Sequence, residues 1–430
     1  MLLSQKIKID VSERDAATLE FMQGKCRGLY NWWVSRLRKG ERWNLNTAKK
    51  SLQESKAYDP DLRFVYGKLL HEVYFRLDKA MQAFFRRVKA EEKKPGFPRF
   101  KPRHEFFTLC YPAMYLEVRG NTIILPTGGG GNWGPKRSPN IRAHLTETPP
   151  EHFREVAVSR DVRGNYYCSF AYDDTEQHQD QDSEDNTRKK RKQRPMREDG
   201  AVAFDLGIKT LAVGVTDQGR FYHIGGFKGY RNYNRQLDKL RSKRDKCKKK
   251  SRRYIRLSKV HKRVSEKKRN KHRDCLHKAS HLIAGKLAER AVVIGDLSQR
   301  QMVMKKNHEE ETPKERNKRR MRNRMVYNDW GLYSFVQMLE YKCVRFGKEL
   351  HIIDERDTTK MCSACKHKQD MPLWKRTYRC SNENCGLVMD RDENSAVNIY
   401  ERFLARLGPH TGDPVRCAAC SPQSTCLKTF

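Results

Sequence analysis

The sequence predicts a multidomain α/β protein: a small N-terminal β-barrel with a helical insertion, followed by an α/β domain that carries an inserted zinc ribbon. Three observations predict this class. The chain has 430 residues, which is too long for one ordinary domain. In the N-terminal half, short strand-like runs follow a long helical stretch. Near the C-terminus, two cysteine pairs lie among apolar runs and helical patterns.

The charge of the chain indicates a polyanionic partner. Lysine and arginine number 90 against 52 acidic residues, which gives a formal net charge of +38. A solvated surface needs no such imbalance, so we expect the protein to bind nucleic acid. A ribosomal or chromatin protein that coats nucleic acid is the plainer alternative. No run of about 18 apolar residues predicts a membrane span, and "MLLSQKIKID" does not resemble a signal peptide.

The N-terminal half is predicted to form a barrel from residues 1–12 and 96–173, with a helical domain over 13–95. "QKIKIDVS" alternates as a strand does, and "FFTLCYP", "MYLEV", "NTIILP" and "YYCSFAY" are further strand-like runs. In the helical stretch, apolar residues recur at helical spacing, and we assign them to the core. They are Leu19, Cys26, Tyr30, Trp33, Leu37, Leu69, Val73, Leu77, Met81 and Phe85. The glycine-rich "TGGGGNWGPK" is interpreted as a flexible turn.

Residues 174–198 are first acidic and then basic, which predicts a charged linker. After it, "AVAFDLG" and "LAVGVTD" predict a strand hairpin, and residues 230–290 predict two long, strongly basic helices. "AVVIGD" is expected to be a buried strand, and residues 303–325 a mobile loop. "WGLYSFVQMLEYKCVRFG" predicts a helix that stops at Gly347, and "ELHIIDE" predicts another strand.

Four cysteines give the strongest single signal. Cys362 and Cys365 form one close pair, and Cys380 and Cys385 form a second. In a reducing compartment, which the absence of a signal peptide predicts, such spacing fits a four-sulfur Zn²⁺ site. We expect this zinc to be structural, because four thiolates leave no open position for water. The tail, residues 409–430, is predicted to be disordered. It holds an incomplete second set with no evident fourth ligand: Cys417, Cys420 and Cys426.

Aspartates mark two further candidate positions. Asp205 lies within an apolar strand, where a carboxylate is costly to bury unless a metal or a partner holds it. A turn aspartate is the alternative. Asp390 and Asp392 precede a helical pattern, and because aspartates often cap helices, one of the two could serve only as a cap.

These elements together resemble the TnpB family of RNA-guided DNA nucleases, which bacterial insertion sequences carry and which are related to the type V CRISPR effectors. The matching stretches are "FDLGIKTLAVG", "VVIGDL", "TTKMCSAC" with the later cysteines, "DRDENSAVNI", and, near the N-terminus, "YNWW" and "PRFKPR". The resemblance implies a wedge barrel with a helical recognition domain. It also implies a RuvC-like nuclease domain of the RNase H type over 199–360 and 387–408, with the zinc ribbon at 361–386.

In the family, three carboxylates hold two Mg²⁺ ions, which activate water and stabilise the leaving oxygen. The resemblance assigns Asp205 and Asp392 to two of these positions. The third is usually a glutamate in Glu-Asp-Leu, but here the stretch is Gly295-Asp296-Leu297.

We predict that Glu355 supplies the missing carboxylate. It ends the strand that should be the parallel neighbour of "AVVIG", and adjacent strands lie about 4.8 Å apart. Ligands collect at the carboxyl ends of parallel strands, and some TnpB proteins and their eukaryotic relatives, the Fanzors, show a similar exchange. Asp296 is the rival, although strand alternation points it to the other face. A surface position for Glu355 is the remaining alternative.

The sequence therefore predicts an Mg²⁺-dependent, RNA-guided DNA endonuclease whose catalytic residues are Asp205, Glu355 and Asp392. Its expected partners are a guide RNA from the transposon end and double-stranded target DNA, without a membrane, and a monomer is favoured. We expect it in the bacterial cytoplasm near the nucleoid, or in the nucleus of a eukaryotic host. The alternative is a nuclease-inactive, RNA-guided repressor of the same fold.

Overall fold

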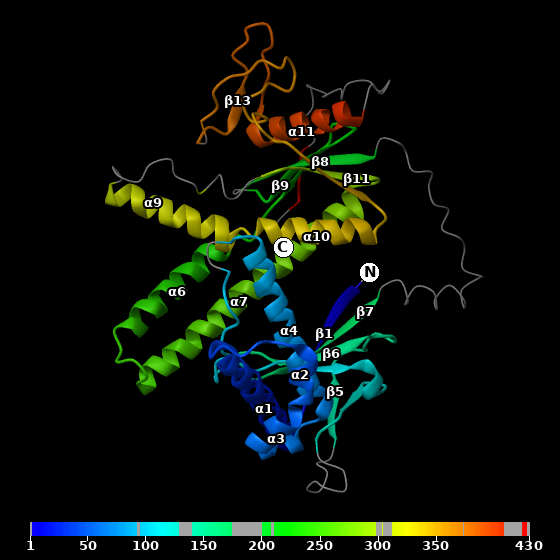
Figure 1. Cartoon of the computed structure of the whole chain (residues 1–430). Helices are drawn as coiled ribbons and strands as arrows, with labels where there is room; N and C mark the ends of the chain where they lie inside the picture. Colours follow the sequence, from blue (N-terminus) through cyan, green and yellow to red (C-terminus); the bar gives the residue numbers. More distant parts are fainter. Residues whose placement is uncertain are drawn as a thin grey trace, which may run out of the picture. The chain divides into compact units, whose positions relative to one another are not determined.

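The chain folds as two compact units, residues 1–189 and 190–430 (Figure 1). The computed structural model describes residues 2–92, 95–128, 140–173, 200–207, 210–297, 303, 312–372, 374–407 and 424–427. Among these described residues, no helix is long and apolar enough to cross a membrane. The charged linker predicted over 174–198 lies outside them, as does most of the glycine-rich turn.

The first unit contains a curled, antiparallel seven-stranded sheet in the order β2-β6-β7-β1-β5-β4-β3. Its strands are β1 (Leu2–Asp10), β2 (Leu109–Pro112), β3 (Glu117–Arg119), β4 (Thr122–Leu125), β5 (Ile141–Leu145), β6 (Glu155–Arg160) and β7 (Tyr166–Asp173). The first strand pairs with β7 along most of its length and with β5 near its end. The opening segment forms a strand, as predicted, and this strand lies in the middle of the sheet, while closure into a barrel stays a prediction.

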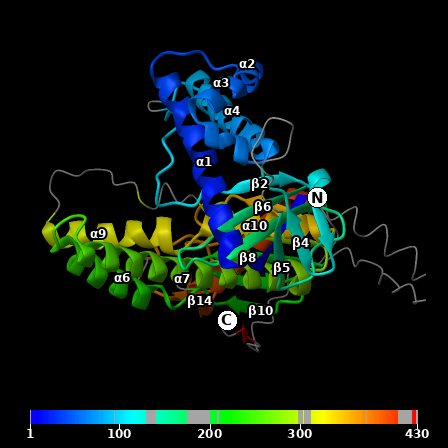
Figure 2. The ribbon, with the colours of Figure 1, turned by 90° about the horizontal axis from the view of Figure 1, so that it is seen from below.

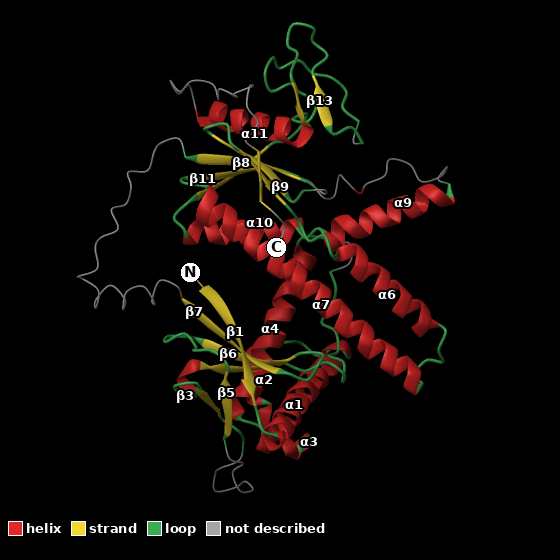
Figure 3. Cartoon of the chain, turned by 180° about the vertical axis from the view of Figure 1, so that it is seen from behind, coloured by secondary structure: helices red, strands yellow, loops and turns green. Residues whose placement is uncertain are grey.

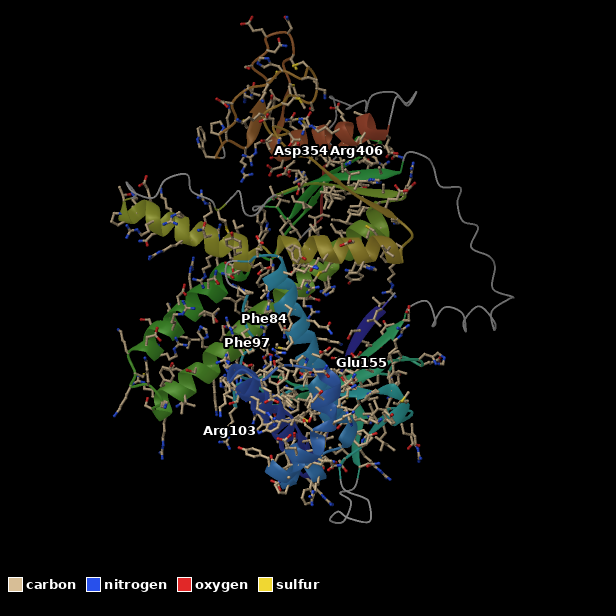
Figure 4. The ribbon with its side chains drawn as sticks, viewed as in Figure 1. Phe84, Phe97, Arg103, Glu155, Asp354 and Arg406 are labelled. Atoms are coloured by element: carbon tan, nitrogen blue, oxygen red, sulfur yellow. The ribbon has the colours of Figure 1, made fainter. Side chains whose placement is uncertain are left out.

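Helices occupy the chain between β1 and β2. They are α1 (Glu13–Arg38), α2 (Leu45–Lys50), α3 (Leu52–Tyr58) and α4 (Gly67–Lys89), with a short 3-10 turn at Pro60–Phe64; a second 3-10 turn, Ala113–Tyr115, follows β2. The predicted core stripe is buried with one exception. Phe85 is 55% exposed, so its assignment to the core was wrong. Its neighbour Phe84 faces inward instead and packs edge-on against Phe97, with ring centroids 5.1 Å apart (Figure 4).

The second unit is built on a mixed sheet in the order β12-β11-β8-β9-β10-β15. Its strands are β8 (Ala201–Leu206), β9 (Ala212–Thr216), β10 (Phe221–Ile224), β11 (Ala291–Gly295), β12 (Glu349–Ile353) and β15 (Ser424–Leu427). The predicted hairpin is confirmed as β8 and β9, and β12 is the parallel neighbour of β11, as predicted. The tail is not wholly irregular: β15 pairs in parallel with β10, so the prediction of disorder was wrong for these four residues.

Helices cover both faces of this sheet, as Figures 1 and 3 show. Alternate residues of β8 point to opposite faces: Val202 and Phe204 pack with α7 (Arg252–Leu282) and α10 (Leu332–Arg345), whereas Ala203 packs with α11 (Arg391–Leu407). The predicted basic helices are α6 (Tyr230–Asp245) and α7, which run side by side (Figure 2). Apolar alternation on β8 thus fixes the two layers that flank the sheet.

The predicted loop over 303–325 is helical in most of its described part, while residues 304–311 lie outside the described residues. Within 303–325, α9 spans Pro313–Arg324, and a π-helical turn, η4, follows at Met325–Asp329. Thr312 and Glu315 cap α9 reciprocally through side chain and backbone. This capping box and the proline at the first helical turn were visible in the sequence. The loop prediction was wrong for these residues because it relied on their polar composition and not on these helix-start signals.

The predicted ribbon is a small hairpin placed directly before α11. Its strands are β13 (Thr377–Arg379) and β14 (Val388–Asp390), which pair antiparallel. Residues 349–363 run from β12 toward the first cysteine pair, so the hairpin lies between the end of β12 and the start of α11. The ribbon is thereby connected at both ends to elements that also carry the predicted carboxylates.

Candidate metal centres

The four predicted zinc ligands lie together. Their sulfurs are all within 4.8 Å of one another, and Cys362 Sγ lies 3.6 Å from Cys385 Sγ while Cys365 Sγ lies 3.5 Å from Cys380 Sγ. A disulfide needs about 2.05 Å, whereas sulfurs around one Zn²⁺ at 2.3 Å are roughly 3.8 Å apart. The arrangement therefore fits a four-sulfur zinc site. In the tail, Cys417 and Cys420 lie outside the described residues.

Two similar turns shape this site. Each cysteine pair is followed by a residue in the left-handed region, Lys366 at φ +62° and Gly386 at φ +64°, which lets the chain reverse beside the sulfurs. The backbone N–H of His367 is the main cause that lowers the pKa of Cys365, to about 6, whereas burial raises the pKa of Cys362 to about 12. A thiolate is the form that binds zinc, so the turn favours this form at Cys365.

The three predicted catalytic carboxylates lie near the carboxyl ends of β8 and β12 and at the start of α11 in the second unit, and their oxygens do not form a group within 4.8 Å of one another. Burial raises the pKa of Asp205 well above its ordinary value of 3.8, and the nearby negative charges of Asp392 and Glu355 raise it further. These effects place both side chains close to Asp205. Three acids from β8, from the end of β12 and from the start of α11 therefore share one electrostatic environment.

Glu355 occupies the space that Gly295 leaves open. A Cβ added to Gly295 would lie 2.3 Å from Oε2 of Glu355, which would force that side chain to move, and 3.1 Å from its Cβ, which is tighter than most van der Waals contacts. The parallel register explains this approach, because Gly295 is paired with Ile353, two residues before Glu355. The absent side chain at position 295 is thus the reason that the glutamate of the neighbouring strand fits here.

The carboxyl group of Glu355 is poorly satisfied within the protein. Its Oε2 is buried and has no hydrogen-bond partner among the described residues. Burial raises the pKa of Glu355 to about 7, with the negative charges of Asp296 and Asp354 as lesser causes. A buried, unpaired carboxylate oxygen beside other acids is the kind of group that a bound cation would stabilise. The rival Asp296 is itself exposed.

Asp392 is held by two arginines that sequence reasoning missed. Arg376 Nη1 lies 3.1 Å from Asp392 Oδ2, and Arg391 Nη2 lies 3.0 Å from Oδ1. The backbone N–H of Asp392 donates to Asp390 Oδ1 at 2.8 Å, so Asp390 is the cap that one of the two aspartates was expected to be. The adjacency of Arg391 was visible in the sequence, whereas no local spacing indicated Arg376.

A buried polar face of α11 joins the carboxylates to the ribbon. Ser395 hydrogen-bonds with Asp205 and lies 2.9 Å from Thr358 Oγ1, which donates to the carbonyl oxygen of Glu355 at 2.9 Å. Asn394 and Asn398 donate to the carbonyl oxygen of Met361, each at 2.8 Å. Their spacing of four residues beside buried apolar positions was the available signal for this network.

The far end of α11 anchors the strand that precedes Glu355. Arg402 Nη1 donates to the carbonyl oxygen of Asp354 at 2.7 Å, and Arg406 Nη1 donates to that of Ile352 at 3.4 Å. Figure 4 shows Asp354 and Arg406 beside this helix. Asp354, Glu355 and the ribbon are therefore all fixed to the helix that carries Asp392.

The donor set fits hard divalent cations. Mg²⁺ prefers carboxylate oxygens and retains several waters, so it needs only one or two protein carboxylates at a time. The unpaired Oε2 of Glu355 and the clustered charge around Asp205 are the observations that favour such a cation. Asp205, Glu355 and Asp392 are the residues that would hold it.

Two family models match stretches of the chain that lie mostly in the second unit. A family model described as "Probable transposase" matches residues 176–306, and one described as "Cas12f1-like, TNB domain" matches residues 333–399. TnpB-like protein L79 of Acanthamoeba polyphaga mimivirus is 32% identical over 145 residues, which is 34% of this chain and 24% of that protein. A "Putative RNA-guided DNA endonuclease" of Streptomyces pristinaespiralis is 28% identical over 269 residues, 61% of this chain and 55% of that protein.

These matches show that parts of the chain are similar to proteins described as probable transposases and, more narrowly, to TnpB-like proteins. The chain spans about half or less of the curated relatives that it matches. The solved structure of CasPhi-2 (Cas12j) bound to crRNA overlaps 93% of this chain and 98% of that one, with 10% identity and a TM-score of 0.41, which is too low to support an argument.

The zinc assignment predicts a simple stoichiometric loss. Purified protein should contain about one zinc per chain, and Cys362→Ser or Cys380→Ser should remove it and destabilise the ribbon, because the metal supplies much of the folding energy of such a site. Elemental analysis measures this. Cys247→Ser, on a cysteine outside the ribbon, is the control and should keep its zinc. Unchanged zinc in the ribbon variants would refute the assignment.

The raised pKa of Glu355 predicts a pH dependence of stability in the metal-free protein. Its value of about 7 in the folded state exceeds the ordinary 4.5, so between these pH values the folded state binds more protons than the unfolded state. Stability should therefore fall as pH rises through this window. The measurement is the thermal unfolding midpoint in chelator at pH 5.5 and pH 8.

In the same experiment, Glu355→Gln removes the titrating group without changing its size. The loss of stability between the two pH values should be smaller in this variant than in the wild type. An identical pH dependence in both proteins would contradict the assignment of the titration to Glu355.

Proposed function

We propose that this chain is an RNA-guided DNA endonuclease of a transposable element, which cleaves target DNA beside a short adjacent motif by two-metal-ion hydrolysis. The observation that carries the proposal is the placement of Glu355. Its side chain fills the space beside Gly295 and contributes to the charge around Asp205 together with Asp392. A carboxylate missing from one strand is thus supplied by the next.

Each carboxylate has a separate role in holding the site. Bound Mg²⁺ would activate water and stabilise the leaving oxygen. Asp205 is fixed by its strand and by Ser395, and Glu355 by the hydrogen bond from Thr358. Arg376, whose side chain is 38% exposed, keeps Asp392 paired and presents guanidinium donors suited to a phosphate. The zinc, with four sulfur ligands, is assigned a structural role.

The proposed partners are a guide RNA and double-stranded target DNA. The net charge of +38 supports this, as do the exposed lysines and arginines along α6 and α7 and the printed name of the Streptomyces relative. In this proposal the sheet of the first unit and its helices form the wedge barrel and the recognition domain. The protein would act as a monomer wherever its target DNA resides, in the bacterial cytoplasm or a eukaryotic nucleus.

A nuclease-inactive, RNA-guided repressor is the second candidate. The observation in its favour is the double ion pair of Asp392 with Arg376 and Arg391, which neutralises one carboxylate without a metal. Against it stands Glu355, whose buried and unpaired oxygen destabilises a protein that has no use for a cation. The two candidates differ in one measurable property, cleavage of a matched target.

Carboxylate exchange tests the catalytic assignment. Glu355→Ala should abolish Mg²⁺-dependent cleavage while guided DNA binding stays nearly intact, because binding depends mainly on the basic surface. Asp205→Ala and Asp392→Ala should behave alike, since ligands of one site act as a unit. Asp296→Ala is the matched control and should keep substantial activity. Cleavage of a matched target is measured beside a binding assay.

The exchange can also be reversed. Gly295→Glu alone should lower cleavage, because the new side chain collides with Glu355. Combined with Glu355→Ala, which removes the collision, it should restore part of the activity. Wild-type cleavage by Glu355→Ala together with loss in Asp296→Ala would overturn the assignment. If the wild type binds its guide and matched target but never cuts, the repressor is favoured.

The basic surface predicts that the protein is purified with RNA. One dominant RNA species should be recovered, and its affinity should fall steeply as salt rises, because each phosphate contact releases counterions. Sequencing the bound RNA and titrating the complex with salt provide the two readouts. A random sample of cellular RNA would count against guide-dependent action and in favour of a protein that coats RNA.

A further inference from the structure

A cavity of about 560 Å³ lies within the second unit, and its lining includes Arg376, which is paired with Asp392. This volume is within the usual range for sites that bind small molecules. Its lining combines aromatic and basic side chains from β10–α6, from η4–α10 and from the ribbon. The residues that matter below are Phe227, Lys228, Tyr230, Arg231, Trp330 and Arg376.

The aromatic side of the cavity is held in place. A Cβ on Gly229 would lie 2.8 Å from the ring of Phe227, so this ring rests on a glycine that leaves it room. The ring centroid of Phe227 is also 6.0 Å from that of His272 and 6.1 Å from that of Tyr233. Trp330 is fixed by a hydrogen bond of 2.6 Å from Nε1 to the carbonyl oxygen of Gly207. The cavity is therefore lined by aromatic side chains whose positions are fixed by their neighbours.

The acidic group in the cavity is already satisfied. Asp329, whose side chain is 2% exposed, forms an ion pair with Lys268, and its Oδ2 accepts from Asn234 at 2.8 Å. It therefore leaves little unbalanced charge for a cation. Asp329 ends the π-helical turn η4, and such turns are frequent at functional sites. The lining is aromatic, and the charge of Asp329 is balanced by Lys268. The cavity therefore favours a flat, uncharged ring as its ligand.

Two connections join the cavity to the candidate active site. Arg376 lines the cavity and binds Asp392 Oδ2 at 3.1 Å. The carbonyl oxygen of Gly207 accepts the hydrogen bond of Trp330, and Gly207 lies two residues after Asp205 in the chain. Lys228 and Arg231 are exposed on the same lining, where their charge complements a phosphate backbone.

We propose that this cavity binds one unpaired nucleobase of the DNA strand that is cut, with Phe227 as the stacking surface. Lys228 and Arg231 contact the flanking phosphates, and Arg376 links the bound nucleotide to the carboxylates. Only a single strand can deliver a base, because a paired base is covered by its neighbours. Stacking on aromatic rings tolerates every base, which suits an enzyme whose target is chosen by a guide. This inference rests on the proposed function and adds a substrate subsite to it.

The experiment uses the guide-bound protein and single-stranded target DNA that carries 2-aminopurine at successive positions near the cut. In chelator, so that no cutting occurs, the wild type should quench 2-aminopurine at one position through stacking. Phe227→Leu should lose this quenching and, with Mg²⁺, cut the matched target about tenfold more slowly, in keeping with the strength of base stacking. Phe227→Trp should retain both properties, which excludes a folding defect as the cause.

Tyr333→Leu is the matched control, because Tyr333 is an aromatic residue that is 69% exposed on α10 and outside the cavity lining. It should quench and cut like the wild type. Unchanged quenching and cutting in Phe227→Leu would overturn the subsite and leave the proposed function standing. Phe227-dependent quenching of the probe in the guide RNA, in place of the DNA, would also overturn it. A third outcome separates the two proposals. If Phe227 is needed for quenching of the DNA probe but the wild type never cuts the target, the subsite is supported and the proposed nuclease activity is refuted.

Discussion

The repulsion that Asp392 and Glu355 exert on the carboxylate of Asp205 is the constraint on which the second unit depends. Burial alone raises the pKa of Asp205 strongly, and Asp392 and Glu355 add to it. Folding tolerates such a cluster only when nearby groups or a bound cation offset the charge. The arginines at Asp392 provide part of this compensation, while Oε2 of Glu355 receives none from the described residues. This uneven compensation indicates where a cation would stabilise the protein most.

Gly295 and α11 together fix the geometry of that cluster. The glycine provides the volume that the Glu355 side chain fills. The polar face of α11 then connects Asp205, Thr358 and the ribbon through hydrogen bonds of Asn394, Ser395 and Asn398, each of which is fully buried. The zinc ribbon is thus tied to the same helix that carries Asp392. Loss of zinc would be expected to disturb the carboxylates through this connection.

The position of Glu355 beside β11 could be predicted from the sequence, because the carboxyl ends of neighbouring parallel strands lie side by side. The order of β11 and β12 along the chain indicated that they are such neighbours. Sequence reasoning reached the four cysteines from their spacing alone. It missed Arg376 and the cavity at Phe227, because these depend on contacts between residues far apart in the chain, which no local pattern records. Phe85 was wrongly assigned to the core because helical spacing identifies the apolar face of a helix but not how far along the helix other elements cover that face. The strand β15 escaped because its stability comes from pairing with β10.

The most direct test is a crystal structure of the full protein soaked with Mn²⁺. This ion replaces Mg²⁺ and can be located by its anomalous scattering. The account predicts anomalous peaks bound by oxygens of Asp205, Glu355 and Asp392, at distances near the 2.0–2.1 Å typical of such ligands. The Glu355 side chain should remain over Gly295. A metal bound by Asp296, with Glu355 turned away to solvent, would contradict the account.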